Sequence, residues 1–194
     1  TNGGGLNFTG VWTVDKPAGA VVLAGNLILS NNQPLTITSG TLNQGSSLNL
    51  QTSALLTVGA NGVLRNFGGG NLTLGGNVSN SGLITINGGG VGCGDPNGVD
   101  PLQIRSTNTT VRTWSGNGTF SLVDVDVDGQ AAGTPPGSIT AFGSSVLGAN
   151  MGAGWTLNPG CPVEINSQPT NQTACIGGSA SFSVGANGTG LSFQ

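Results

Sequence analysis

The sequence predicts an all-β protein built as a parallel β-solenoid, a stack of coils with short strands on each side. Three observations predict this fold. Glycine supplies 37 of the 194 residues and charged residues only 6%, against averages of about 7% and about 25%. Short apolar alternations return along the chain, separated by Asn-Gly and Ser-Gly pairs. Strong helix formers are scarce, since Lys16, Glu164 and Met151 are each the only residue of their type.

The predicted strands are brief and alternate apolar with polar residues, so that their apolar side chains share one face. They lie at residues 27–29, 35–37, 48–50, 72–74 and 84–86. Tight turns are predicted between strands because Asn and Gly tolerate positive φ. The turn signals are Asn61-Gly62, Ser81-Gly82, Asn87-Gly88 and Asn97-Gly98.

The chain also repeats itself at irregular intervals. Residues 48–50 align with 72–74 at an offset of 24, and residues 61–64 align with 81–84 at an offset of 20. A repeat of this length is one coil of three short strands, with coils stacked about 4.8 Å apart. We therefore expect inward Leu, Ile and Val to stack between coils, and stacked Asn to form side-chain ladders.

Composition excludes several classes of function. The chain has no His, which removes Ser-His and Cys-His nucleophiles and imidazole zinc sites. Four basic residues and a pI near 4.3 cannot neutralise a phosphate backbone, so no nucleic-acid partner is expected. Polar residues interrupt the uncharged stretch 17–64, so we expect no membrane span. Since the chain begins at Thr1, we expect it to be a processed product or a piece of a longer protein.

One cluster of acidic residues suggests a metal or catalytic site. Asp124, Asp126 and Asp128 alternate with valines, so a single strand would place all three carboxylates on one face, about 6.7 Å apart. They could bind Ca²⁺, or two of them could act as the carboxylate pair of a glycosidase or lyase. The alternative is a solvated face balanced by Arg105 or Arg112 from an adjacent coil.

A second candidate calcium site lies on a turn, where Asp95, Asn97 and Asp100 offer three oxygen-bearing side chains. The same residues also suit an Asx turn, which hydrogen-bonds its own backbone. The basic residues are scattered along the chain. We therefore assign no catalytic residue, and calcium is the only cofactor considered.

Aromatic and glycosylation signals carry less information. Trp12, Trp114 and Trp155 could stack on sugar rings if exposed, but we expect Trp12 and Trp155 to plug the two ends of the core. Seven Asn-X-Ser/Thr sequons are expected from a composition this rich in Asn, Thr and Ser. They begin at Asn7, Asn71, Asn77, Asn108, Asn117, Asn171 and Asn187.

The stretch "LLTVGANGVLRNFGGGNLTLGGNVSNSGLITINGGG" resembles the coils of right-handed parallel β-helices in very large secreted bacterial surface proteins, the filamentous-adhesin type. Residues 93–130 resemble the closing coils of such stalks. The following "CPVEINSQPTNQTACIGGSASFSVGANGTGLSFQ" is similar to the opening of bacterial immunoglobulin-like modules. The resemblance implies a right-handed parallel β-helix over residues 1–160 and an incomplete immunoglobulin-like sandwich over 161–194.

Three opening strands of that sandwich are expected at residues 163–165, 179–184 and 191–193. An immunoglobulin-like domain needs about 80 to 100 residues, whereas Cys161 to Gln194 supplies 34. The missing strands would come from later sequence or from a neighbouring subunit.

The resemblance implies a non-catalytic structural segment at the bacterial cell surface, forming a stalk, an adhesive fibre or an extracellular filament. Expected partners are neighbouring copies in a fibre and surface glycans. The alternatives are a glycan- or ice-binding module and a polysaccharide-degrading enzyme. A binding module should present aligned Thr or a row of aromatics, whereas here the Thr residues fall irregularly along the sequence and the Trp residues lie far apart.

A secreted chain seldom leaves thiols free, so a disulfide between Cys93 and Cys161, which bracket the last coils, is expected. Cys161 with Cys175 is the competing pair. If the first pair forms, Cys175 is unpaired or finds a partner outside this chain.

Overall fold

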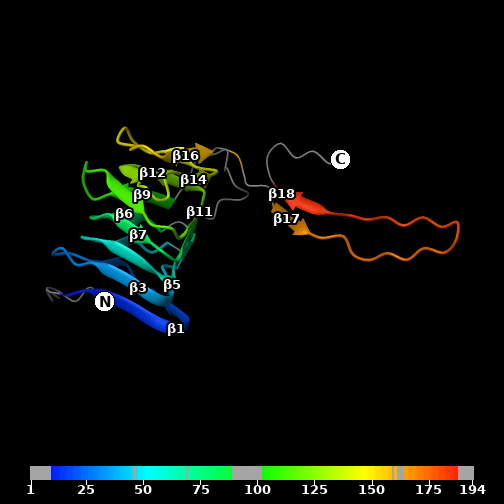
Figure 1. Ribbon diagram of the computed structural model, residues 1–194, viewed down its shortest axis with the longest axis horizontal. Helices are drawn as coiled ribbons and strands as arrows, with labels where there is room; N and C mark the ends of the chain where they lie inside the picture. Colours follow the sequence, from blue (N-terminus) through cyan, green and yellow to red (C-terminus); the bar gives the residue numbers. More distant parts are fainter. Residues whose placement is uncertain are drawn as a thin grey trace.

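The computed structural model describes residues 10–45, 47–68, 70–88, 102–158, 160 and 164–187. Within them every regular element is a strand, and the main body is a parallel β-solenoid of about five turns, as predicted (Figure 1). No helix in these residues is long and apolar enough to cross a membrane.

One face of the solenoid is a six-stranded parallel sheet that each coil crosses once. Its strands are β2 (Leu27–Ile28), β4 (Leu50–Gln51), β6 (Leu72–Leu74), β9 (Leu102–Ser106), β12 (Val125–Val127) and β15 (Ser145–Val146). Each strand has only two to five residues, because a coil must turn a corner before the next face begins.

The other two faces belong to one ten-stranded sheet. Its strands are β1 (Trp12–Val22), β3 (Leu35–Asn43), β5 (Leu56–Phe67), β7 (Val78–Asn80), β8 (Leu83–Asn87), β10 (Arg112–Ser115), β11 (Thr119–Val123), β13 (Gln130–Ala132), β14 (Ile139–Phe142) and β16 (Trp155–Asn158). The early strands span both faces, since β5 pairs with β7 through residues 56–58 and with β8 through 63–67. Each coil therefore has three sides.

The core is a set of inward rows that run from coil to coil. Leu35, Leu56, Val78 and Trp114 occupy successive rungs of one row, and all four are fully buried. Backbone hydrogen bonds join the coils, as when the Leu35 N–H donates to the Leu55 carbonyl at 3.0 Å. Inward side chains are thus packed against their equivalents above and below, as the alternation predicts.

Of the two repeat offsets predicted from the sequence, one is confirmed and the other is wrong. The offset of 20 is confirmed, because Val63 pairs with Leu83. The offset of 24 is wrong, because Leu50 pairs with Leu72 at an offset of 22. Leu48 lies outside the strand, and a slip of two residues keeps the same side chains pointing inward.

Stacked asparagines line the corner before the six-stranded sheet, but their side chains bond to the backbone of the next coil and not to one another as expected. The Asn49 N–H donates to Asn26 Oδ1 at 2.9 Å, and the Asn71 N–H donates to Asn49 Oδ1 at 3.1 Å. The next rung ends the stack, with the Gln103 N–H donating to Asn71 Oδ1 at 3.0 Å. Each amide oxygen thereby satisfies a backbone donor of the following coil.

Corners also require glycine where two coils approach closely. A Cβ on Gly62 would lie 2.3 Å from the Ile37 carbonyl oxygen, and a Cβ on Gly82 would lie 2.3 Å from that of Gly59. No side chain can occupy those positions without moving the backbone of the adjacent coil.

Beyond the solenoid, β17 (Glu164–Ser167) and β18 (Gly185–Asn187) form a two-stranded antiparallel sheet. The expected strand at 179–184 is wrong, since those residues belong to no strand and pairing begins at Gly185. Two short strands bury too little apolar surface to hold a longer ladder. An immunoglobulin-like sandwich is not shown, and the expected strand at 191–193 lies outside the described residues.

Candidate functional site

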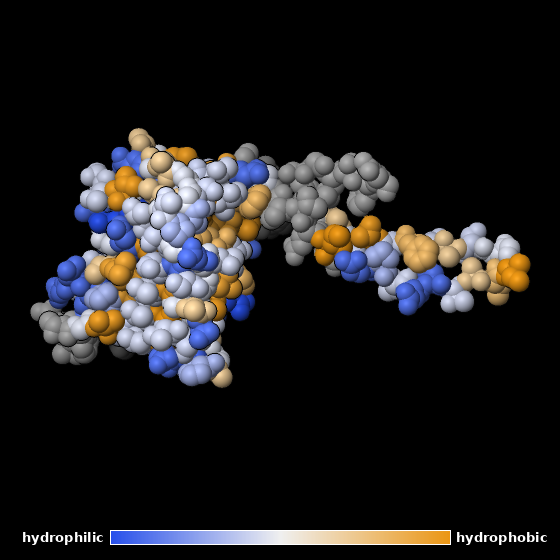
Figure 2. Space-filling model, viewed as in Figure 1, coloured by the Kyte–Doolittle hydropathy of each residue, from blue (hydrophilic) through white to orange (hydrophobic). Residues whose placement is uncertain are grey.

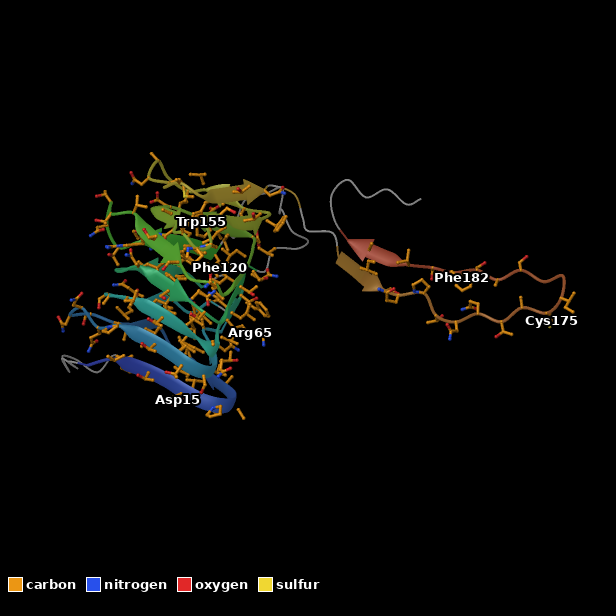
Figure 3. All side chains as sticks on the ribbon, viewed as in Figure 1. Asp15, Arg65, Phe120, Trp155, Cys175 and Phe182 are labelled. Atoms are coloured by element: carbon orange, nitrogen blue, oxygen red, sulfur yellow. The ribbon has the colours of Figure 1, made fainter. Side chains whose placement is uncertain are left out.

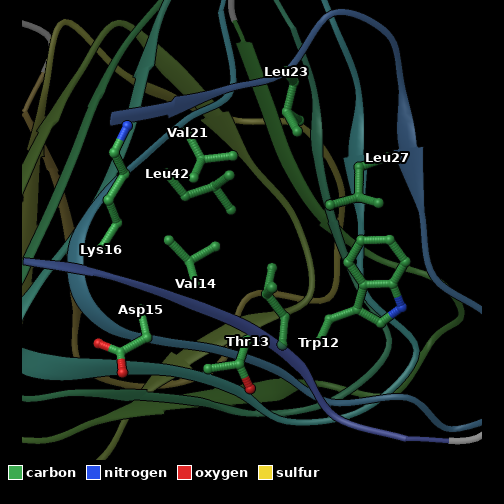
Figure 4. Close-up of a pocket in the computed structure, with 10 residues that line it drawn as sticks. Trp12, Thr13, Val14, Asp15, Lys16, Val21, Leu23, Leu27 and Leu42 are labelled. Carbon is green, nitrogen blue, oxygen red and sulfur yellow. The ribbon is translucent and has the colours of Figure 1, made fainter. Parts of the chain in front are cut away.

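An apolar hollow lies at the first coil, where the inward rows end (Figure 4). It has a volume of about 400 Å³. Its apolar lining comes from the first coil and the coil that follows it: Trp12, Val14, Val21, Leu23, Leu27, Leu35 and Leu42. Thr13, Asp15 and Lys16 also line it. We call it the end cavity.

Strand β1 forms the rim of the end cavity and pairs, among the described residues, only with β3. Its exposed side chains include Trp12 at 41% and Val22 at 61% exposure. The charged residues of the rim form hydrogen bonds within the chain. Ser39 Oγ donates to Asp15 Oδ1 at 2.6 Å, and Lys16 Nζ donates to the Ala20 carbonyl at 3.2 Å. The rim therefore presents apolar side chains and strand backbone.

The tryptophans behave differently at the two ends of the stack. Trp155, on the last solenoid strand, packs against the core and meets Trp114 edge to face, with ring centroids 5.4 Å apart. This agrees with the expected plug at that end. Trp12 lines the end cavity but is substantially exposed, so it only partly closes the first coil. Trp114 is fully buried, and its Nε1 donates to Gln130 Oε1 at 2.7 Å.

The aspartate cluster is not assembled as the alternation predicted. Asp124 is a corner residue with φ of 55° between β11 and β12, so the three carboxylates do not share one strand face. Asp126 accepts a hydrogen bond from Ser145 Oγ. Asp128 directly follows β12. Its carboxylate lies so close to Gly148 that a Cβ on Gly148 would clash with it. The corner breaks the period-two alternation on which the prediction rested.

No group of three or more His, Cys, Asp or Glu side chains that could hold a metal ion occurs among the described residues. The second candidate calcium site, at Asp95, Asn97 and Asp100, lies outside them, as do Cys93 and Cys161. Cys175 is an exposed free thiol, so the competing pair with Cys161 is not formed. In the described part of the chain there is no disulfide.

Strand pairing aligns hydroxyl side chains that are scattered in the sequence. Successive rungs on one outer face carry Thr13, Thr36, Thr57, Ser79 and Ser115. Parallel rungs lie about 4.8 Å apart, so these five residues form a straight row. The irregular spacing of Thr along the chain was therefore a misleading signal, because coils of unequal length still place equivalent residues side by side.

A shallower hollow lies on the six-stranded face and is lined by polar residues. It has a volume of about 320 Å³ and is lined by Gln51, Thr73, Arg105, Ser106 and Thr107. No carboxylate lines it, so it does not provide the paired acids that glycoside hydrolysis requires.

Several sequon asparagines hydrogen-bond to the backbone. The side-chain oxygens of Asn71, Asn77 and Asn108 accept backbone hydrogen bonds from Gln103, Thr113 and Thr110. Asn117 and Asn171 are exposed, Asn7 lies outside the described residues, and Asn187 ends β18.

Comparison with known proteins adds no relative: no family model, no curated protein and no solved structure matches the chain. The site therefore has to be interpreted from its own residues. Sequence reasoning missed the end cavity, although the alternation of Trp12 with Val14 at the first coil was a signal of an inward row.

Proposed function

We propose that this chain is a non-catalytic structural segment of a secreted bacterial cell-surface protein, in which right-handed coils build a stalk, an adhesive fibre or an extracellular filament. The continuous stack supports this proposal most directly. Its inward rows pass through successive coils, and backbone hydrogen bonds join each coil to the next. Such a stack resists bending and extension along its length because every coil is bonded to its neighbours. The right hand is the one favoured by parallel crossovers.

The first coil supports a role in assembly. Strand β1 carries eleven residues with one paired side among the described residues, next to an apolar cavity. A bare edge beside apolar surface is a template for pairing with another strand. We propose that neighbouring copies are the principal partner, with surface glycans as a further one.

Negative-stain electron microscopy of the native material tests this function. We expect rods or filaments whose length increases with protein concentration. Steady turnover of an acidic polysaccharide by the isolated protein would contradict the structural role.

A second candidate function is supported by the row of Thr13, Thr36, Thr57, Ser79 and Ser115. A flat, regular hydroxyl array suits the binding of an ordered surface such as ice or a glycan. Inhibition of ice recrystallisation by the wild-type chain, lost in Thr36→Lys and Thr57→Lys, would support this candidate. A Thr156→Lys variant, which changes a strand on another face, is the matched control.

We also propose that residues 161–194 are the opening of an immunoglobulin-like module. The hairpin exposes apolar side chains that a sandwich would bury, with Ile165 at 54% and Phe182 at 65% exposure. Figure 2 shows such hydrophobic residues gathered along it. Later sequence or a neighbouring chain would supply what covers them, and the intact mass of the native protein distinguishes a chain near 19 kDa from a longer one.

A further inference from the structure

We propose that the end cavity of one copy binds the extended segment 179–184 of a second copy, so that copies join head to tail. The proposal rests on the proposed structural function and identifies its joint. It assigns an acceptor at the first coil and a donor beyond the last coil of the solenoid.

In the acceptor, some backbone N–H and C=O groups of β1 point away from β3, toward the position that an added strand would take. The Trp12 N–H donates to the Pro34 carbonyl at 2.9 Å, which directs the backbone groups of Trp12 toward β3. Neighbouring residues of a strand direct their N–H and C=O to opposite sides, so those of Thr13 point away from β3. The Leu23 N–H likewise donates to Asn43 at 3.0 Å, which directs the groups of Val22 outward. An added strand can hydrogen-bond at these positions.

The acceptor also has a place for side chains. The end cavity is lined by Trp12, Val14 and Val21 from β1 and by Leu42 from β3. Its volume of about 400 Å³ is in the range of pockets that bind small molecules. An inserted apolar side chain would continue the rows that fill every later coil.

The donor segment has no strand partner among the described residues. Residues 179–184 lie outside β17 and β18, and no backbone hydrogen bond from them is found in the described part of the chain. The segment alternates Ser with apolar residues, which places Ala180, Phe182 and Val184 on one face. Phe182 is 65% exposed and lies on the part of the hairpin that extends away from the solenoid (Figure 3).

Charge favours this donor for this acceptor. The chain carries no charged residue after Glu164, so the donor brings no ion into an apolar cavity. The rim charges of Asp15 and Lys16 already have intramolecular partners. Each rim charge therefore keeps a hydrogen-bond partner when the donor docks, and the donor adds no further charge to be desolvated.

The placement of donor and acceptor decides the kind of assembly. The acceptor is at the first coil, whereas the donor follows the last one (Figure 1). Two different surfaces that meet head to tail form a heterologous contact, which repeats from copy to copy. Such a contact builds an open fibre when the rotation between successive copies does not close a ring, and the open fibre is the assembly that we propose.

Sedimentation velocity of the full chain over a range of concentrations tests the joint. We expect the wild type to associate, and Phe182→Asp and Thr13→Pro to weaken association at least tenfold. Thr13→Pro removes an outward N–H and leaves the bond from Trp12 to β3 in place. Val146→Asp is the matched control, because Val146 is 53% exposed on β15 and should not change association.

The outcomes of this experiment test the assigned joint separately from the proposed function. If the wild type associates and Phe182→Asp associates equally well, the assigned joint is wrong and the proposed function stands. If the wild type remains monomeric at every concentration, the joint fails together with the fibre and filament forms of the proposed function, and only a stalk built within one chain stands. Circular dichroism of Thr13→Pro verifies that the variant is folded.

A peptide spanning residues 177–187 provides a second measurement. Its addition to the Phe182→Asp chain should shift Trp12 fluorescence to shorter wavelength, because the exposed indole lines the cavity that the peptide fills. The shift should be absent in a chain that also carries Trp12→Phe. No shift in the Phe182→Asp chain would overturn the assignment of the donor.

Discussion

The buried indole of Trp114 provides a quantitative test of the core. Its Nε1 donates to Gln130 Oε1 at 2.7 Å, and both residues are fully buried. Its ring also packs against Phe120 and Trp155, at centroid distances of 5.9 Å and 5.4 Å. Trp114→Phe keeps an aromatic ring but leaves Gln130 Oε1 without this donor.

The expected cost follows from these contacts. A buried acceptor left unpaired costs about 1–3 kcal/mol, and the smaller ring adds a small cavity, so Trp114→Phe should lower the free energy of unfolding by about 2–3 kcal/mol. Trp114→Ala should cost about 3–5 kcal/mol, the range for removing a buried Trp. Trp155→Phe is the matched control, since Trp155 Nε1 is buried and has no hydrogen-bond partner among the described residues. It should cost about 1 kcal/mol or less, because no hydrogen bond is lost.

Urea unfolding followed by near-ultraviolet and far-ultraviolet circular dichroism measures the three variants. The urea midpoint should be highest for Trp155→Phe, lower for Trp114→Phe and lowest for Trp114→Ala. The slope of the unfolding free energy against urea concentration should not change. Equal losses for Trp114→Phe and Trp155→Phe would refute the buried bond to Gln130.

Three further predictions concern corners and the disulfide. Gly62→Ala should destabilise the fold by about 2–3 kcal/mol, because its Cβ would lie 2.3 Å from the Ile37 carbonyl oxygen. Gly25→Ala is the control and should change the thermal midpoint little, because an added Cβ at Gly25 meets nothing within 4 Å. Equal shifts in the midpoints of the two variants would contradict the close approach at Gly62. Asn80→Ala should cost about 1–3 kcal/mol in urea unfolding, since Nδ2 donates to Thr119 O and Oδ1 accepts from the Gly82 N–H; no loss would show that the corner bonds are absent. Peptide mapping without reduction should recover Cys93 linked to Cys161, a loop whose closure stabilises by about 4 kcal/mol in the entropic model, and recovery of Cys93 as a free thiol would exclude that pair.

Sequence reasoning succeeded where the pattern is local. The alternation of apolar residues predicted the inward rows, and the alignment of Asn61-Gly62 with Ser81-Gly82 predicted the pairing of Val63 with Leu83. The tight turn expected at Asn61-Gly62 is wrong, because both residues lie within β5 and pair with β3. It failed for Leu48 because a slip of two residues preserves the alternation, so the pattern alone could not distinguish offsets of 22 and 24.

Other errors arose where tertiary contacts override the pattern. Asp124 continues the alternation in sequence, but it takes a left-handed conformation at a corner, so the aspartates separate. The hydroxyl row was missed because the coils have unequal lengths, and only the pairing of strands shows that Thr57 and Ser79 are neighbours. The end cavity needs residues from two coils, which no local pattern brings together.

The central claim is that coils distant in sequence stack in parallel along one axis. Thr13 and Ser115 lie four rungs apart on the outer row, a separation of about 19 Å at 4.8 Å per rung. Pulsed electron paramagnetic resonance should measure it in a chain carrying spin labels at both positions and serine at the three native cysteines. The account predicts one narrow distance distribution centred near 20 Å, and a broad distribution or a centre far from this value would contradict the stack.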